Sequence, residues 1–142
     1  MAITSGFNHV ATLTTDLDRF AEWYGRVFGA EVTFSMEAEG DHPRMFIVDL
    51  GGGAALNVFE VPAEAMIGEQ RRIGARGAID HFGIAVPDVA TLETVRERLV
   101  EAGADVGDIQ VLGGDTHSLF FRDVDGMELE VCAPVVPVAP VS

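Results

Sequence analysis

The sequence predicts an α+β fold built from two tandem βαβββ modules. Two stretches, FNHVATL near the N-terminus and IDHFGIAVPD in the second half, each have the residues of a β-strand with a histidine near its start. Each stretch leads into a segment whose apolar residues recur at helical spacing. His9 and His81 lie 72 residues apart (81 − 9), and Asp16 and Asp88 keep the same offset (88 − 16). The second half therefore repeats the plan of the first.

Length and composition are those of one ordinary globular domain. The chain has 142 residues, of which 48% are hydrophobic and 23% are charged. No apolar run approaches the roughly 20 residues that a membrane span needs, and the first residues do not resemble a signal peptide. We expect one compact domain in the cytoplasm that does not interact with membranes.

Charge and residue usage exclude several function classes. The formal net charge is −14, with 23 acidic and 9 basic side chains, so nucleic acid and anionic membranes are not expected partners. All basic residues are arginines, and the absence of lysine excludes a Schiff-base lysine and a P-loop. Cys132 is the only cysteine, so no internal disulfide or thiolate metal cluster can form, and we expect it to fill space in a strand.

The first module is expected to span residues 1–62. Its first strand leads to Thr15, which with Asp18 fits a capping box at the start of a helix, and Gly29 fits the end of that helix. The strands of the module are expected at residues 7–14, 31–37, 44–50 and 54–61.

Residues 63–78 are interpreted as a linker with room for one helical turn. Arg71, Arg72 and Arg76 lie there, in a solvated connection or, alternatively, beside an anionic group of a ligand.

The second module is expected to span residues 79–134. Its helix begins after Pro87 and Asp88 and ends at Gly103. Residues 135–142 are rich in proline and are expected to run extended along the surface or a partner. The strands of this module are expected at residues 79–86, 104–111, 116–122 and 127–133.

Two glutamates stand at similar distances from the two histidines. Glu130 lies 49 residues after His81 (130 − 81), and Glu60 lies 51 residues after His9 (60 − 9), each in the last strand of its module. Two imidazoles with one carboxylate suit a non-heme Fe(II) site, and a second carboxylate suits Ni, Zn, Mn or Co. The sequence therefore predicts a divalent metal site, although Glu60 also fits an exposed carboxylate at a strand end.

The alternation of side chains along a strand suggests which residues share a face. Matching Pro62 to Pro134 places Val58 opposite Glu130 and predicts that Glu60 points to the same face as that position. Asn57 is then expected on the opposite face. Alternation alone does not choose between Glu130 and Glu128, which share a face. His117 fits a loop-edge histidine or an acid–base group of the same site.

The paired modules, the NHV and DHFGIAV strands and the closing segment FFRDVDGMELEV resemble the vicinal oxygen chelate superfamily over residues 7–133. The closing segment is similar to the family pattern D-P-D-G-N-x-[IL]-E, with Val124 and Met127 in place of the usual proline and asparagine. The resemblance implies curved sheets that enclose a cavity, within one chain or across a homodimer. It places His9, His81 and Glu130 on ligand positions of the family and Glu60 on or near the fourth.

The same resemblance implies two alternative functions. The first is a metal-dependent lyase, isomerase or dioxygenase that chelates two neighbouring oxygens of a small organic substrate, with Glu60 or Glu130 carrying a proton. The second is a non-catalytic protein that binds an antibiotic or another natural product in the same cavity. The complete ligand set favours the enzyme.

Overall fold

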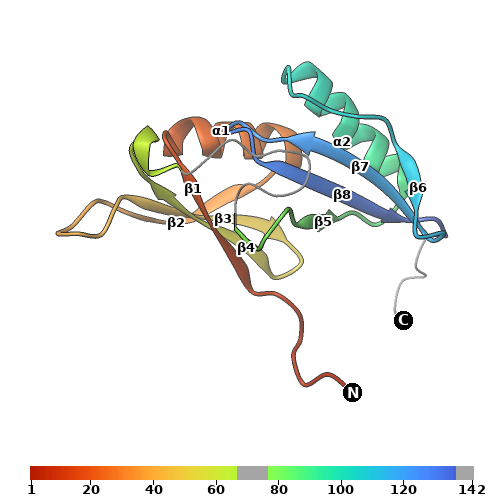
Figure 1. The fold of residues 1–142 in the computed structure, drawn as a ribbon, viewed down its shortest axis with the longest axis horizontal. Coiled ribbons are helices and arrows are strands. Elements are labelled where there is room, and N and C mark those ends of the chain that lie inside the picture. Colours follow the sequence, from red (N-terminus) through yellow and green to blue (C-terminus); the bar gives the residue numbers. More distant parts are fainter. Residues whose placement is uncertain (67–76, 137–142) are drawn as a thin grey trace. The chain divides into compact units, whose positions relative to one another are not determined.

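A computed structural model describes residues 1–66 and 77–136 of the chain. The chain divides into two compact units, Met1–Ile67 and Gly68–Ser142, which are described separately below. Each unit contains a four-stranded mixed sheet and one long helix (Figure 1).

The first unit has the order β-α-β-β-β, as expected. In its sheet the strand order is β1-β4-β3-β2, with β1 parallel to β4 and the other neighbours antiparallel. A short 3-10 helix, η1, follows β4. The elements are β1 (His9–Thr14), α1 (Leu17–Phe28), β2 (Glu31–Met36), β3 (Met45–Gly51), β4 (Ala54–Glu60) and η1 (Ala63–Ala65).

The second unit repeats this topology element by element. Its strand order is β5-β8-β7-β6, again with the first and last strands parallel. The elements are β5 (Gly83–Ala85), α2 (Val89–Glu101), β6 (Gln110–Leu112), β7 (Thr116–Arg122) and β8 (Glu128–Pro134). The predicted α+β fold of two βαβββ modules is confirmed, and each sheet is open and does not close on itself.

One helix covers one face of each sheet. Leu17, Phe20, Tyr24 and Val27 recur along α1 at helical spacing and are fully buried, as are the strand residues Leu56 and Val58. In the second unit α2 packs against β7 and β8 in the same way, through Leu92, Val95 and Leu99. Within residues 1–66 and 77–136, no long helix of the same unit covers the other face of either sheet (Figure 1). We call this face of each sheet its open face.

Helix α1 begins one residue later than the predicted capping box implies. Asp16, not Thr15, is the N-cap: its backbone is extended, and its carboxylate accepts a hydrogen bond from the backbone N–H of Arg19 at 3.0 Å. The hydroxyl of Thr14 also accepts from the N–H of Asp16. The carboxylate of Asp16 therefore has the capping role that was predicted for Thr15. Gly29 ends the helix in the left-handed conformation, as predicted.

Two strands of the second unit are shorter than predicted. The strand expected at 79–86 is β5, which spans only three residues, and most of the strand expected at 104–111 is irregular. Val106 forms a single bridge with Phe121 there. Asp and Gly residues at 105–108 disfavour a regular ladder, and the side chain of Arg96 donates to the carbonyl of Gly107.

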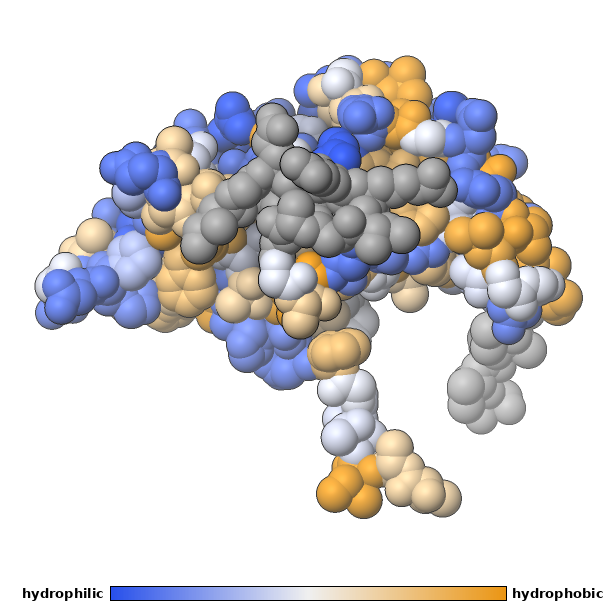
Figure 2. All heavy atoms as spheres, in the orientation of Figure 1, coloured by the Kyte–Doolittle hydropathy of each residue, from blue (hydrophilic) through white to orange (hydrophobic). Residues whose placement is uncertain are grey.

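The ends of the units carry little regular structure. The segment before β1 exposes hydrophobic side chains, among them Ile3 and Phe7 (Figure 2). The expected linker at 63–78 begins with η1, but Arg71, Arg72 and Arg76 lie outside the described residues, as does the end of the tail after residue 136. Among the described helices, none has the length and apolar character to cross a membrane.

The N-cap gives a direct test of the first unit. We expect Asp16→Ala to lower the free energy of unfolding by about 1 kcal/mol, because the N–H of Arg19 loses its partner. The matched control Thr15→Ala should change it by less than about 0.5 kcal/mol. Urea unfolding followed by circular dichroism measures both, and a larger loss for Thr15→Ala would contradict the assignment of the cap.

Candidate functional site

His81 and Glu130 lie together in the second unit. Gly83 pairs with Glu130 across the parallel strands β5 and β8, and His81 stands two residues before Gly83, so the histidine and the glutamate share a face. The Nε2 atom of His81 lies 3.1 Å from Oε2 of Glu130. Both side chains are partly buried. The predicted pairing of a histidine with a glutamate from the last strand is therefore present in this unit.

Asp80 holds the other nitrogen of the His81 ring. Its Oδ2 atom lies 2.7 Å from Nδ1 of His81. A proton on Nδ1 leaves Nε2 with its lone pair in the neutral ring, whereas the imidazolium donates from both nitrogens. The hydrogen bond to Asp80 raises the pKa of His81, partial burial opposes this, and Glu130 raises the pKa further. In the absence of another cation, these contacts thus favour protonated His81, with a proton between its Nε2 atom and Glu130.

Ser118, which the sequence did not single out, binds the second oxygen of Glu130. Its buried hydroxyl on β7 donates to Oε1. Desolvation raises the pKa of Glu130, but hydrogen bonds from Ser118, Cys132 and His81 outweigh it, so the pKa is lowered and the carboxylate stays ionised. The sequence shows polar residues on β7, but only the strand register shows that Ser118 is the one that faces Glu130.

Cys132 stands beside the same carboxylate on β8. Burial, and then the charge and hydrogen bonding of Glu130, raise the pKa of its thiol to about 11. The thiol is therefore protonated at neutral pH and is not a nucleophile, in agreement with the expected role in filling space.

Phe120 and Gly83 shape the surroundings of the pair. The ring of Phe120 contacts the ring of His81 edge to face, with centroids 5.3 Å apart. Gly83 has a negative φ, so its backbone does not require glycine. A Cβ atom there would lie 3.5 Å from Sγ of Cys132 and 4.0 Å from Oε2 of Glu130. The missing side chain leaves room directly beside the carboxylate.

The structure also separates two other candidates from this pair. Glu128 shares the face of Glu130 but lies opposite Arg122 in the β7–β8 ladder, so Glu130 is the glutamate beside His81. His117 lies opposite Ala133, on the face that carries the buried residue Leu119. His117 therefore points away from the face of His81 and Glu130.

In the first unit, His9 begins strand β1 and is exposed. Its Nδ1 atom lies 2.8 Å from the side-chain oxygen of Asn8, and it pairs with Ala55 of β4. By alternation His9 stands on the face of the sheet that α1 does not cover, because Thr14 on the other face is buried at the start of the helix.

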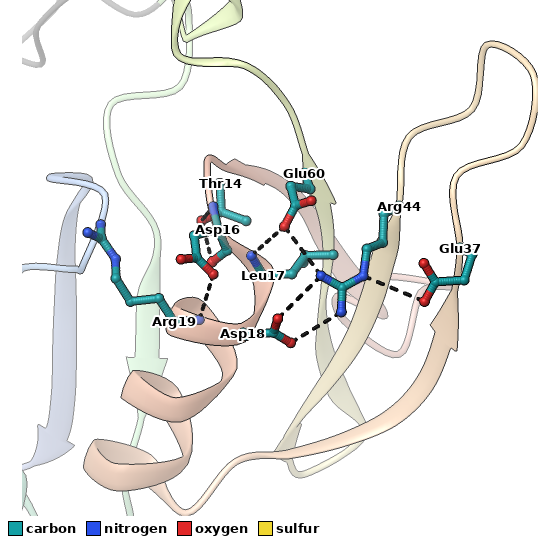
Figure 3. A network of polar contacts seen from close by, with 8 residues as sticks. All are labelled: Thr14, Asp16, Leu17, Asp18, Arg19, Glu37, Arg44 and Glu60. Atoms are coloured by element: carbon teal, nitrogen blue, oxygen red, sulfur yellow. Dashed lines mark hydrogen bonds and ion pairs between the residues drawn. The ribbon is translucent and has the colours of Figure 1, made fainter.

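Glu60 lies at the N-terminus of helix α1. Its Oε2 atom accepts a hydrogen bond from the backbone N–H of Leu17 at 2.9 Å, and it lies 3.5 Å from a guanidinium nitrogen of Arg44 (Figure 3). Arg44 also contacts Asp18 at 3.2 Å and Glu37 at 3.7 Å. Glu60 thus links the end of β4 and the residue before β3 to the first turn of the helix, where a negative charge is favoured.

The predicted face of Glu60 is wrong. Ala11, 72 residues before Gly83, pairs with Asn57, whereas Gly83 pairs with Glu130. Asn57, not Val58, is the counterpart of Glu130, because β4 and β8 are offset by 73 residues and not by 72. A shift of one residue moves every side chain to the other face of a strand. Glu60 consequently lies on the helix-covered face, and Asn57 shares the face of His9.

The donor set of the second unit fits a divalent cation. A metal-binding histidine commonly donates its second N–H to a carboxylate, as His81 does to Asp80, and an ionised glutamate lies beside its Nε2 atom. Within the described parts of the chain, no three His, Cys, Asp or Glu side chains are grouped so that they could hold a metal ion. The structure thus brings together two donor side chains in this unit, His81 and Glu130.

Two βαβββ units in tandem, the second with a histidine just before its first strand and a glutamate on its last strand, define a class of duplicated α+β folds. The sequence matches the Glyoxalase/Bleomycin resistance protein/Dioxygenase superfamily over residues 6–131. The chain belongs to this superfamily, and the resemblance noted in its sequence is confirmed.

Solved structures of similar fold span nearly the whole chain. A glyoxylase/bleomycin resistance protein/dioxygenase domain from Frankia sp. EAN1pec is 26% identical, with a TM-score of 0.76, over 92% of this chain and 98% of that one. The fosfomycin resistance protein FosX from Listeria monocytogenes is 17% identical, with a TM-score of 0.69, over 92% and 94%. Lactoylglutathione lyase from Agrobacterium tumefaciens is 21% identical, with a TM-score of 0.66, over 93% and 96%. No protein of curated function matches the sequence.

The contact between Asp80 and His81 predicts a change in titration. In metal-free protein, Asp80→Asn should lower the pKa of His81, because a neutral amide stabilises the imidazolium less than a carboxylate does. Titration of the ring resonances by NMR in the presence of a chelator measures this pKa. Asp108→Asn, which removes a carboxylate that pairs with Arg96, should leave it unchanged. A pKa that stays constant or rises in Asp80→Asn would contradict the assigned contact.

Proposed function

We propose that this protein is a divalent-metal-dependent enzyme of the vicinal oxygen chelate type that acts on a small organic substrate. The observation that carries the proposal is the pair formed by His81 Nε2 and Glu130 Oε2, 3.1 Å apart, with Asp80 holding the other side of the imidazole. This arrangement directs one neutral nitrogen donor and one anionic oxygen donor at the same place, and both are ligands that transition metals accept.

His81 and Glu130 are the ligands in this proposal, and His9 stays a ligand predicted from the sequence alone. Fe, Ni, Zn, Mn and Co are the candidate ions, and the FosX structure from Listeria monocytogenes in complex with Mn(II) makes Mn²⁺ a suitable first probe. When bound, such an ion supplies Lewis-acid chemistry that polarises a substrate oxygen. Asp80 fixes the orientation of His81, and Ser118 holds Glu130 ionised.

Glu60 is not included in the proposed ligand set. Its carboxylate oxygen already accepts the N–H of Leu17 and faces Arg44 on the helix-covered side of its sheet. Of the two glutamates that the sequence suggested as proton carriers, Glu130 is the one we retain. It is ionised, partly exposed and within reach of a ligand on the open face, so it can accept a proton from a bound molecule.

The reaction class within this proposal is a lyase or isomerase reaction, with oxygen-dependent ring cleavage as the Fe(II) variant. One protein of similar fold is named a lactoylglutathione lyase, and another is named a fosfomycin resistance protein. The proposal also includes a homodimer and a cytoplasmic location, as expected from the sequence.

The second candidate function is a non-catalytic protein that binds an antibiotic or natural product. The observation that favours it is the apolar character of the open face in the first unit, where Leu13 and Phe34 are 40% and 49% exposed and Phe59 lies on the same face. Tight binding of an aromatic natural product by protein that takes up no metal would support this function over the enzyme.

Metal titration tests the first candidate. Purified protein should bind about one divalent ion per site, and His81→Ala should abolish this binding because a nitrogen ligand is lost. Elemental analysis and calorimetric titration with Mn²⁺ measure both results. The matched control His117→Ala removes a histidine from the opposite face of the same sheet and should bind as the wild type does. Equal affinity in wild type and His81→Ala would exclude His81 as a ligand.

The two glutamates should respond in opposite ways to replacement. Glu60→Ala should lower the free energy of unfolding by about 1–2 kcal/mol, since the N–H of Leu17 loses its partner, and should leave Mn²⁺ affinity unchanged. Glu130→Ala should abolish Mn²⁺ binding. Urea unfolding and calorimetry on the same two variants separate the roles, and loss of metal binding in Glu60→Ala would return Glu60 to the ligand set.

A further inference from the structure

Ser118 stands next to the carboxylate that faces His81. It lies opposite Cys132 in the β7–β8 ladder, and Glu130 precedes Cys132 by two residues, so Ser118 and Glu130 point to the same face of the sheet. The side chain of Ser118 is fully buried, and its hydroxyl donates to Oε1 of Glu130. A buried hydroxyl that donates a hydrogen bond to an ionised carboxylate forms one of the stronger kinds of hydrogen bond in proteins.

The two oxygens of Glu130 have separate partners. Oε1 accepts from Ser118, and Oε2 lies 3.1 Å from Nε2 of His81. If the carboxylate rotated to exchange its oxygens, the hydrogen bond to Ser118 would have to break first. The thiol of Cys132 also approaches Glu130 but is a much weaker donor than a hydroxyl. Ser118 therefore has the main control over how the carboxylate is turned.

We infer that Ser118 is a positioning residue that fixes the orientation of Glu130 and keeps Oε2 beside His81 for the metal ion. The inference rests on the proposed function for the presence of the ion, whereas the bond between Ser118 and Glu130 can be tested without it. Ser118 acts through Glu130 and does not bind the ion itself. Replacing a partner that orients a metal ligand typically weakens metal affinity by about 10–100-fold.

Calorimetric titration with Mn²⁺ tests the inferred role. Ser118→Ala should raise the dissociation constant for Mn²⁺ by about 10–100-fold, and Ser118→Thr should recover most of the affinity because threonine keeps the hydroxyl. Thr116→Ala is the matched control: it removes a hydroxyl from the same face of the same strand, one that bonds to Asp115 and not to Glu130. This control should bind Mn²⁺ as the wild type does.

The titration separates the role of Ser118 from the proposed binding of a metal ion. Equal Mn²⁺ affinity in wild type and Ser118→Ala overturns the positioning role and leaves the proposed function standing. Equal loss in Ser118→Ala and Thr116→Ala also overturns it, since the effect would then belong to the strand and not to the bond. No Mn²⁺ binding by the wild type overturns the proposed function together with the role of Ser118 toward the ion.

A double-mutant cycle in the presence of a chelator examines the bond in metal-free protein. If Ser118 acts through Glu130, Ser118→Ala should lower the urea midpoint of the wild type but not that of Glu130→Ala. An equal decrease in both backgrounds would mean that Ser118 only fills space, and would overturn the inference whatever the metal titration gives.

Discussion

The covering of each sheet by a single helix is the constraint on which the rest of this structure depends. Because successive side chains of a strand point to opposite faces, one half of each strand packs under the helix and the other half is left for chemistry. In β8, Leu129 and Val131 belong to the core, so Glu130 between them is directed to the open face. Burial of these two aliphatic neighbours thus fixes the face to which a charged group points.

The repeat, the helices and the His81–Glu130 pair were predictable from local patterns. Apolar residues at helical spacing, a glycine after each helix and an equal offset between the two halves are all visible without knowledge of strand register. The face of Glu60 was not predictable in this way. The strand AALNVFEV carries apolar residues at both alternating sets of positions, so periodicity does not tell which set faces the helix. Only the pairing of Ala11 with Asn57 decides it.

Contacts that join separate strands were also beyond the sequence. Ser118 and Glu130 are 12 residues apart and meet only because β7 and β8 form a hairpin with the observed register. Arg44 contacts carboxylates from α1, from β4 and from the residue that follows β2, and their proximity follows from the order of strands in the sheet (Figure 3). In the second unit, His117 and Ala133 occupy the positions that Arg44 and Glu60 have in the first, so the ion pair between these two positions is specific to the first unit.

Gly83 has a consequence for how such a protein can diversify. Its negative φ is open to any residue, and a Cβ atom would meet its neighbours at ordinary contact distances, so the fold places no demand on this position. Yet a Cβ atom added there would lie 4.0 Å from Oε2 of Glu130. A single codon change at Gly83 can therefore resize the surroundings of the carboxylate at almost no cost in stability. Selection for a new ligand could act on this position while the scaffold stays unchanged.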